Sequence, residues 1–291
     1  MTEQTRLRAG AESLAAPLPP LLAAAEHLAS TVMLGAHGRR RSGMGDEFWQ
    51  YRQSHAGDEA RSIDWRRSAR SDALFVREKE WQAAQSVLLW IDGAQSMQFA
   101  SKGAMQTKMD RAKLISLAVS VLLIRAGERV GLTGLNMPPR SGEMQLLRLT
   151  QLLYDAKGED DYGTPDVRGM VPHSRAVFVS DFLGDISAMS AALTGAADKG
   201  IKGAILHVLD PEEEAFPFDG RTIFESVGGS VRHETLKAAD LRDRYLDRLA
   251  ARKAELLALA QAAGWQYHCH HTDAPASSAL LWLYGAMERS T

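Results

Sequence analysis

Apolar and polar residues follow two different periods along residues 86–291. Short apolar runs, each bounded by polar or glycine-containing turns, predict buried strands at 86–91, 129–135, 175–181, 202–210 and 265–271. Between them, apolar residues at helical spacing predict helices over 108–126, 143–156, 186–198, 237–263 and 277–288. A Gly-Gly pair inside residues 220–235 predicts a hairpin.

Strands that alternate with helices in this way predict an α/β fold. We expect a mostly parallel, Rossmann-like sheet with helices on both faces. In such sheets, ligands bind beyond the carboxyl ends of the strands, near the point where strand order reverses. Asp92, Asp181 and Asp210 each end a predicted strand, so they are placed at that edge.

The first 85 residues have a different character. Residues 1–35 are rich in Ala and Leu and predict an N-terminal helical extension, with a helix over about 21–34. Residues 36–85 mix arginine, acidic and aromatic residues without regular period, which predicts short strands and turns. The expected organisation is therefore an extension (1–35), an Arg- and aromatic-rich segment (36–85) and the α/β domain (86–291).

Composition excludes several classes of protein. Hydrophobic residues make up 45% and charged residues 24% of 291, as in ordinary globular proteins, and the net charge of −2 favours neither nucleic acid nor a membrane surface. A single cysteine, Cys269, excludes an internal disulfide framework. Neither a signal peptide nor an apolar stretch long enough to span a membrane is evident, so we expect a cytoplasmic protein.

The stretch LLWIDGAQSMQF, residues 88–99, carries the first candidate chemistry. Mg²⁺ prefers oxygen ligands, which Asp92 and Ser96 could supply from the strand end and the following turn. Thr164 and Asp181 could add two more from later loops. A strand-end aspartate is also a common helix cap or turn former, and the residues alone favour that simpler role.

Together, IDGAQSM before a helix and VFVSDF further along resemble the von Willebrand factor A fold. In that family an Asp-x-Ser-x-Ser motif, a Thr and a later Asp form a metal-ion-dependent adhesion site. Asp92, Ser96, Thr164 and Asp181 match it, but Ala94 replaces the middle Ser. The resemblance implies a degenerate site that either holds Mg²⁺ weakly or binds a partner without metal.

Residues 43–80 resemble the signature of the domain of unknown function 58 (DUF58). Its fixed positions correspond here to Gly57, Asp58, Arg61, Asp64, Trp65 and Arg70 among others. Members of that bacterial family often accompany MoxR-type AAA+ ATPases. The resemblance therefore implies a non-enzymatic adaptor that works with such an ATPase in assembling or activating client proteins, through the surface at Asp92, Ser96 and Asp181.

The arginine-rich segment leaves other roles open. Asp58 with Arg61, and Asp64 with Arg66 or Arg70, are expected to form internal ion pairs. The arginines at 39–41 are the expected exposed exception and candidate partner contacts: Arg39, Arg40 and Arg41. One alternative function is nucleic-acid binding through residues 36–81. Another is a metal-dependent phosphoester hydrolase that uses the carboxylates at 92 and 181.

Two further features favour structural roles. On a strand, His268 and His270 share one face while Cys269 and His271 share the other, which leaves two potential metal ligands per face and no closed site. The acidic run 212–214 is expected to be a solvated loop. Phosphate-loop, dinucleotide-binding, nucleophile-elbow and zinc-protease motifs are absent from the sequence.

Overall fold

A computed structural model describes residues 18–32, 40–55, 58–70, 73–82, 84–135, 137–156, 158, 160–225, 229 and 232–289. The chain divides into two compact units, one made of residues 1–35 and 86–290 and the other of residues 36–85. Each unit is described below by itself.

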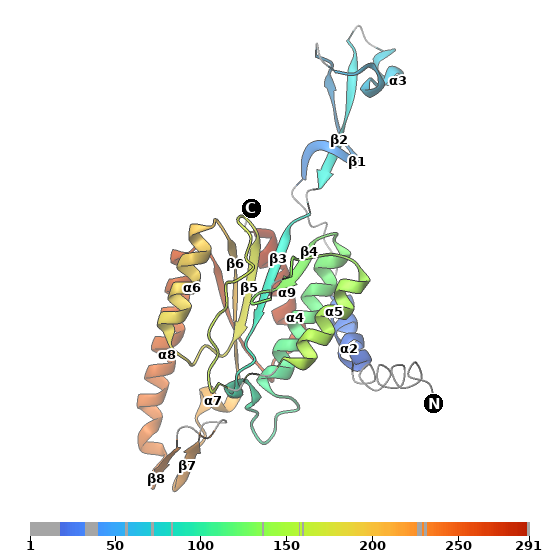
Figure 1. Cartoon of the computed structure of the whole chain (residues 1–291). Helices are drawn as coiled ribbons and strands as arrows, with labels where there is room; N and C mark the ends of the chain where they lie inside the picture. Colours follow the sequence, from blue (N-terminus) through green and yellow to red (C-terminus); the bar gives the residue numbers. More distant parts are fainter. Residues whose placement is uncertain are drawn as a thin grey trace, which may run out of the picture. The chain divides into compact units, whose positions relative to one another are not determined.

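The first unit contains a five-stranded parallel sheet (Figure 1). Its strands are β3 (Ser86–Ile91), β4 (Arg129–Leu132), β5 (Arg175–Ser180), β6 (Lys202–Leu209) and β9 (Gln266–His271), in the order β4-β3-β5-β6-β9. All five predicted strands are confirmed. The second is shorter than expected, because the chain turns at Gly134, whose φ of 76° favours glycine.

Helices cover both faces of this sheet, as predicted (Figure 1). One face packs against α2 (Leu18–Ser30), α4 (Lys108–Arg125), α5 (Glu143–Asp155) and α9 (Ala276–Arg289). The other packs against α6 (Ile186–Asp198) and α8 (Ala239–Ala262). Successive residues of β3 point to opposite faces of the sheet: Leu89 packs in the core under the first group of helices, and Trp90 packs in the core under the second. The α/β fold class is therefore confirmed.

Local signals in the sequence set the ends of the long helices. Thr107 caps α4: its hydroxyl accepts from the backbone N–H of Asp110, whose carboxylate in turn accepts from the N–H of Thr107. Gly127 and Gly264, with φ of 84° and 69°, follow the ends of α4 and α8. Both helices end within one residue of the bounds predicted from the sequence.

Short elements lie beyond the carboxyl ends of the strands. The turn after β3 contains the 3-10 helix η2 (Gln95–Gln98), and α7 (Pro211–Ala215) follows β6. The predicted hairpin is present as the antiparallel pair β7 (Thr222–Glu225) and β8 (Arg232–Thr235). These elements build the candidate site.

The second unit is a two-stranded antiparallel sheet with short helices. Its elements are β1 (Arg40–Gln53), η1 (Ala60–Ser62), α3 (Trp65–Ser68) and β2 (Phe75–Gln82). Of the six signature residues Gly57, Asp58, Arg61, Asp64, Trp65 and Arg70, the first lies outside the described residues. Arg39 also lies outside them, and the side chains of Arg40 and Arg41 in β1 are not described.

Other contacts of the same residues are described inside this unit, and the expected ion pairs stay predictions. Arg61 pairs with Glu59, and Asp58 accepts from the backbone N–H of His55 at 2.7 Å. The Asp64 carboxylate accepts from the N–H of Arg67 at 2.9 Å and so caps α3. A carboxylate just before a helix is better satisfied by the unpaired N–H groups of its first turn.

Within the described residues, none of the helices has both the length and the apolar character needed to cross a membrane.

Candidate functional site at the carboxyl edge of the sheet

Strand order reverses between β3 and β5. After β3 the chain crosses to β4 on one side of it, and then returns to β5 on the other. The loops that follow β3 and β5 therefore diverge at one edge, where parallel α/β sheets place their ligands. Asp92 and Asp181 lie at this edge, each directly after its strand.

The Asp92 carboxylate is almost fully buried. Its Oδ1 accepts from the backbone N–H of Ala94 at 2.8 Å, and its Oδ2 accepts from the Ser180 hydroxyl at 2.6 Å. A Cβ added to Gly163 would lie 2.0 Å from Oδ1, so the loop backbone covers the carboxylate. Burial raises the pKa of Asp92, and the hydrogen bonds oppose that rise only in part.

Asp181 has a fixed cation as its partner. The ammonium of Lys108, the first residue of α4, donates to Asp181 Oδ2 at 2.8 Å and to Glu213 Oε1 of α7 at 2.6 Å. Lys108 is 0% exposed, and Phe99 places its ring 5.8 Å from the ammonium.

Charge and burial act in opposite directions on these three groups. Burial raises the pKa of Asp181, but attraction to Lys108 outweighs it and leaves that pKa below its ordinary value. Burial also opposes the charge of Lys108, but the two carboxylates raise the pKa of its ammonium overall. For Glu213 burial wins and raises the carboxyl pKa. Lys108 and Asp181 therefore form the ionised pair of this site.

The structure brings three of the four predicted ligand residues together. Ser96 lies on η2 near Asp181, and within the described part of the chain its buried hydroxyl has no hydrogen-bond partner. Ala94, which stands where the resemblance predicts a serine ligand, is also buried. Thr164 follows Gly163, which touches Asp92, but Thr164 itself is exposed.

These residues do not fit a divalent cation well. Both oxygens of Asp92 accept hydrogen bonds, and both oxygens of Asp181 accept as well, from Lys108 and from the N–H of Leu183 at 3.2 Å. A second cation beside the ammonium would be repelled, and Mg²⁺ needs several free oxygens in octahedral geometry. The protein supplies its own positive charge at this edge.

Helix α7 corrects the expectation of a solvated acidic loop. Asp210 and Glu213 form a capping box across Pro211, the first residue of the helix. The sequence carries this signal, because Asp-Pro-Glu-Glu places a cap, an N1 proline and an N3 acid in order. Asp210 also accepts from the backbone N–H and the hydroxyl of Ser101, which ties α7 to the loop after β3.

A second polar cluster holds α7 from its other side. Glu214 contacts Lys253 of α8 and His271 of β9, and it lies with Cys269 and His271 in a group whose ligand atoms are within 4.8 Å of one another. The predicted pairing of Cys269 and His271 on one strand face is consistent with this group. Because the Glu214 carboxylate already pairs with the Lys253 ammonium, the main role of the cluster is to hold α7 in place.

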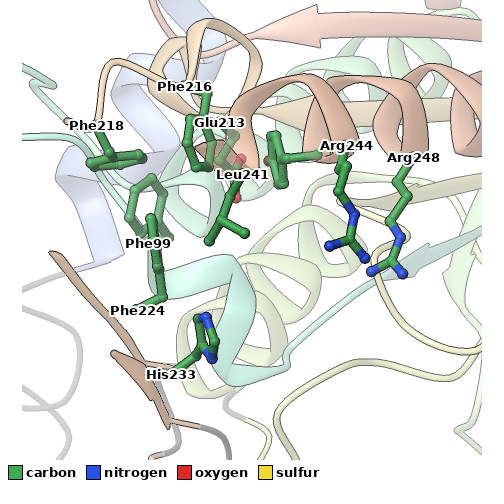
Figure 2. Close-up of a pocket in the computed structure, with 10 residues that line it drawn as sticks. Phe99, Glu213, Phe216, Phe218, Phe224, His233, Leu241, Arg244 and Arg248 are labelled. Atoms are coloured by element: carbon green, nitrogen blue, oxygen red, sulfur yellow. The ribbon is translucent and has the colours of Figure 1, made fainter. Parts of the chain in front are cut away.

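An aromatic pocket of about 560 Å³ opens next to the Lys108 site (Figure 2). Phe99 and Glu213, which both contact Lys108, are among its lining residues. The others come from the chain just after α7, the hairpin and α8: Phe216, Phe218, Phe224, His233, Leu241, Arg244, Tyr245 and Arg248. Sequence reasoning missed this pocket, because its residues come from segments that only the fold brings together.

One family model matches more than half of the chain. Residues 50–255 match the model of a family described as "Protein of unknown function DUF58". Similar curated proteins include uncharacterized proteins of Mycobacterium bovis and of Mycobacterium tuberculosis strain H37Rv. Each is 27% identical over 261 residues, covering 84% of this chain and 80% of its own.

Two solved structures are similar at low identity. One is the conserved hypothetical protein BatB from Bacteroides thetaiotaomicron, at 14% identity and a TM-score of 0.38. The other is an aerotolerance-related membrane protein from Bacteroides fragilis, at 12% identity and a TM-score of 0.39. Each match covers 70% of this chain and 98% of the other.

Proposed function

Since the chain belongs to the DUF58 family, for which no function is described, we propose that it is a non-enzymatic adaptor that docks a partner protein without metal. The partner class is the MoxR-type AAA+ ATPase that the sequence resemblance implies, and the adaptor presents client proteins to it. The observation that carries the proposal is the buried Lys108 ammonium between Asp181 and Glu213. With the Lys108 ammonium fixed at the carboxyl edge of the sheet, the loops there do not need Mg²⁺ to hold them in place.

Exposed apolar side chains on the surrounding loops support a docking role. Met105, in the segment between η2 and α4, is fully exposed, and Tyr162, in the loop that covers Asp92, is 43% exposed. Large apolar side chains surrounded by polar ones are typical anchors of protein interfaces. Both lie on loops that the Lys108 and Asp92 contacts hold in place.

A pull-down of the tagged full chain from native bacterial lysate tests this proposal, run once with Mg²⁺ and once with EDTA. We expect the AAA+ ATPase in both buffers, and much less of it with the Met105→Ser/Tyr162→Ser variant. Leu281→Ser is the matched control, because Leu281 is 60% exposed on α9, away from these loops. Recovery only with Mg²⁺, or no ATPase in either buffer, would contradict the proposal.

A further inference from the structure

The walls of the aromatic pocket are packed against one another. Phe216 lies at the centre, with its ring centroid 4.9 Å from that of Tyr245 and 5.2 Å from that of Phe218. Phe218 in turn contacts Phe224 of the hairpin, at 5.3 Å between ring centroids. The Phe216–Phe218 and Phe218–Phe224 contacts are edge-to-face, and such contacts hold aromatic rings in defined orientations. The cavity is therefore preformed and does not need a ligand to order its walls.

The backbone at Phe216 is also fixed. Its φ of 43° is in the left-handed region, which a bulky residue rarely adopts, and Arg242 of α8 donates to its carbonyl oxygen at 3.1 Å. The ring is 4% exposed despite this strained conformation. Strain of this kind persists where surrounding contacts determine the position, often beside a binding site.

The rim of the pocket is cationic on one side. Arg244 and Arg248 are four residues apart on α8, and Figure 2 shows them projecting in the same direction from the helix. Both are exposed, and among the described residues no carboxylate pairs with either. Glu213, the acid of the pocket lining, is already held by Lys108. Within the part of the chain that the structure describes, the two guanidinium groups are therefore available to an anionic ligand.

We propose that this pocket binds an acidic peptide segment with one aromatic or large aliphatic anchor residue. The anchor fills the Phe-lined cavity, and carboxylates beside it in the peptide accept from Arg244 and Arg248. A volume of about 560 Å³ is large enough for such an anchor with part of its backbone. The proposal rests on the proposed function only in taking the natural ligand to be a segment of a partner protein.

Isothermal titration of the full chain with defined pentapeptides tests the proposal. The probe is acetyl-Asp-Glu-Phe-Asp-Glu-amide, and the two comparison peptides replace its Phe by Ser or its four acids by Lys. We expect binding of the probe, at least about tenfold weaker binding of the Ser peptide, and none of the Lys peptide. Failure of the probe to bind, or equal binding of the Lys peptide, would overturn the proposal.

Variants assign any binding to the pocket. Arg244→Gln/Arg248→Gln should weaken binding of the probe by about tenfold or more. Leu241→Ser, in the apolar wall, should have an effect of the same size. The control Lys199→Gln/Lys202→Gln removes the same charge at the amino end of β6, so its affinity should stay within about twofold of the wild type. An equal loss of affinity for the probe in both double variants would mean that only the net charge matters, and it would refute binding in the pocket.

The two proposals can fail separately. Peptide binding in this assay needs no ATPase and no lysate, so it can succeed when the pull-down recovers no ATPase. That result would support peptide binding in the pocket and contradict the ATPase as the partner. An ATPase recovered equally by the wild type and by Arg244→Gln/Arg248→Gln, together with no peptide binding, would keep the adaptor and remove the pocket.

Discussion

Replacing Lys108 by methionine tests the central feature of the candidate site. Methionine keeps a long, flexible and unbranched side chain but removes the ammonium that bridges Asp181 and Glu213. The two carboxylates would then face each other in a buried space without a positive charge. We expect a large loss of stability and, at the same time, a new ability to respond to Mg²⁺.

The magnitude follows from the burial of the pair. Breaking a buried ion pair by removing one partner costs about 3–5 kcal/mol, because the remaining charge stays buried. Glu213 has a raised carboxyl pKa and can take up a proton, so the low end of that range is expected at acidic pH. If the vacated space binds Mg²⁺ with a dissociation constant of about 1 mM, then 10 mM Mg²⁺ would restore about 1.4 kcal/mol.

Urea denaturation at pH 7.5, with 10 mM Mg²⁺ or with EDTA, measures both effects. The wild type should give the same free energy of unfolding in the two buffers, while Lys108→Met should be more stable with Mg²⁺. The double variant Lys108→Met/Asp181→Asn removes a ligand as well, so its response to Mg²⁺ should disappear. Lys202→Met, at an exposed position, controls for the loss of a lysine and should behave as the wild type.

Two results would refute the reasoning. A loss below about 1 kcal/mol for Lys108→Met would mean that the ion pair does not hold this edge together. A wild-type protein that Mg²⁺ stabilises as strongly as the variant would mean that a divalent cation binds beside the ammonium. The metal-free basis of the proposed docking would then be wrong.

Three further predictions concern single positions. Gly163→Ala should cost about 1–3 kcal/mol in urea denaturation, since its Cβ would collide with a buried carboxylate, whereas Gly103→Ala, in open space, should be near neutral. Thr107→Ala should cost about 1 kcal/mol by removing the helix cap; an unchanged urea midpoint would contradict that role. Burial lowers the pKa of His207 to about 3 and that of His270 to about 4. Both imidazoles therefore stay neutral in the folded protein at pH values where they take up protons in the unfolded chain. Stability should therefore fall as pH drops from 6.5 to about 4, by up to about 1.4 kcal/mol per pH unit for each histidine, and His207→Gln should reduce that slope.

Much of the sheet could be predicted because its signals are local. β3, β5 and β6 are short, mostly apolar runs, and in β3 and β5 the run ends at an aspartate that begins a polar loop. Helix α7 was missed because the acidic run 212–214 favoured a solvated loop, although Pro211 before it is well suited to the first position of a helix. The helix cap formed by Asp64 was missed for a similar reason, since only arginines were considered as its partners and not the backbone of the next helix.

The partner of Asp181 could not be found from the sequence. Lys108 looks like an ordinary polar residue at the start of a helix, 73 positions before that carboxylate. Lys108 is buried only because the fold brings Phe99 and α7 around it, and no periodic pattern in the sequence indicates these contacts. At position 94 the buried methyl group of alanine packs beside this site without needing a hydrogen-bond partner, which a buried hydroxyl would need.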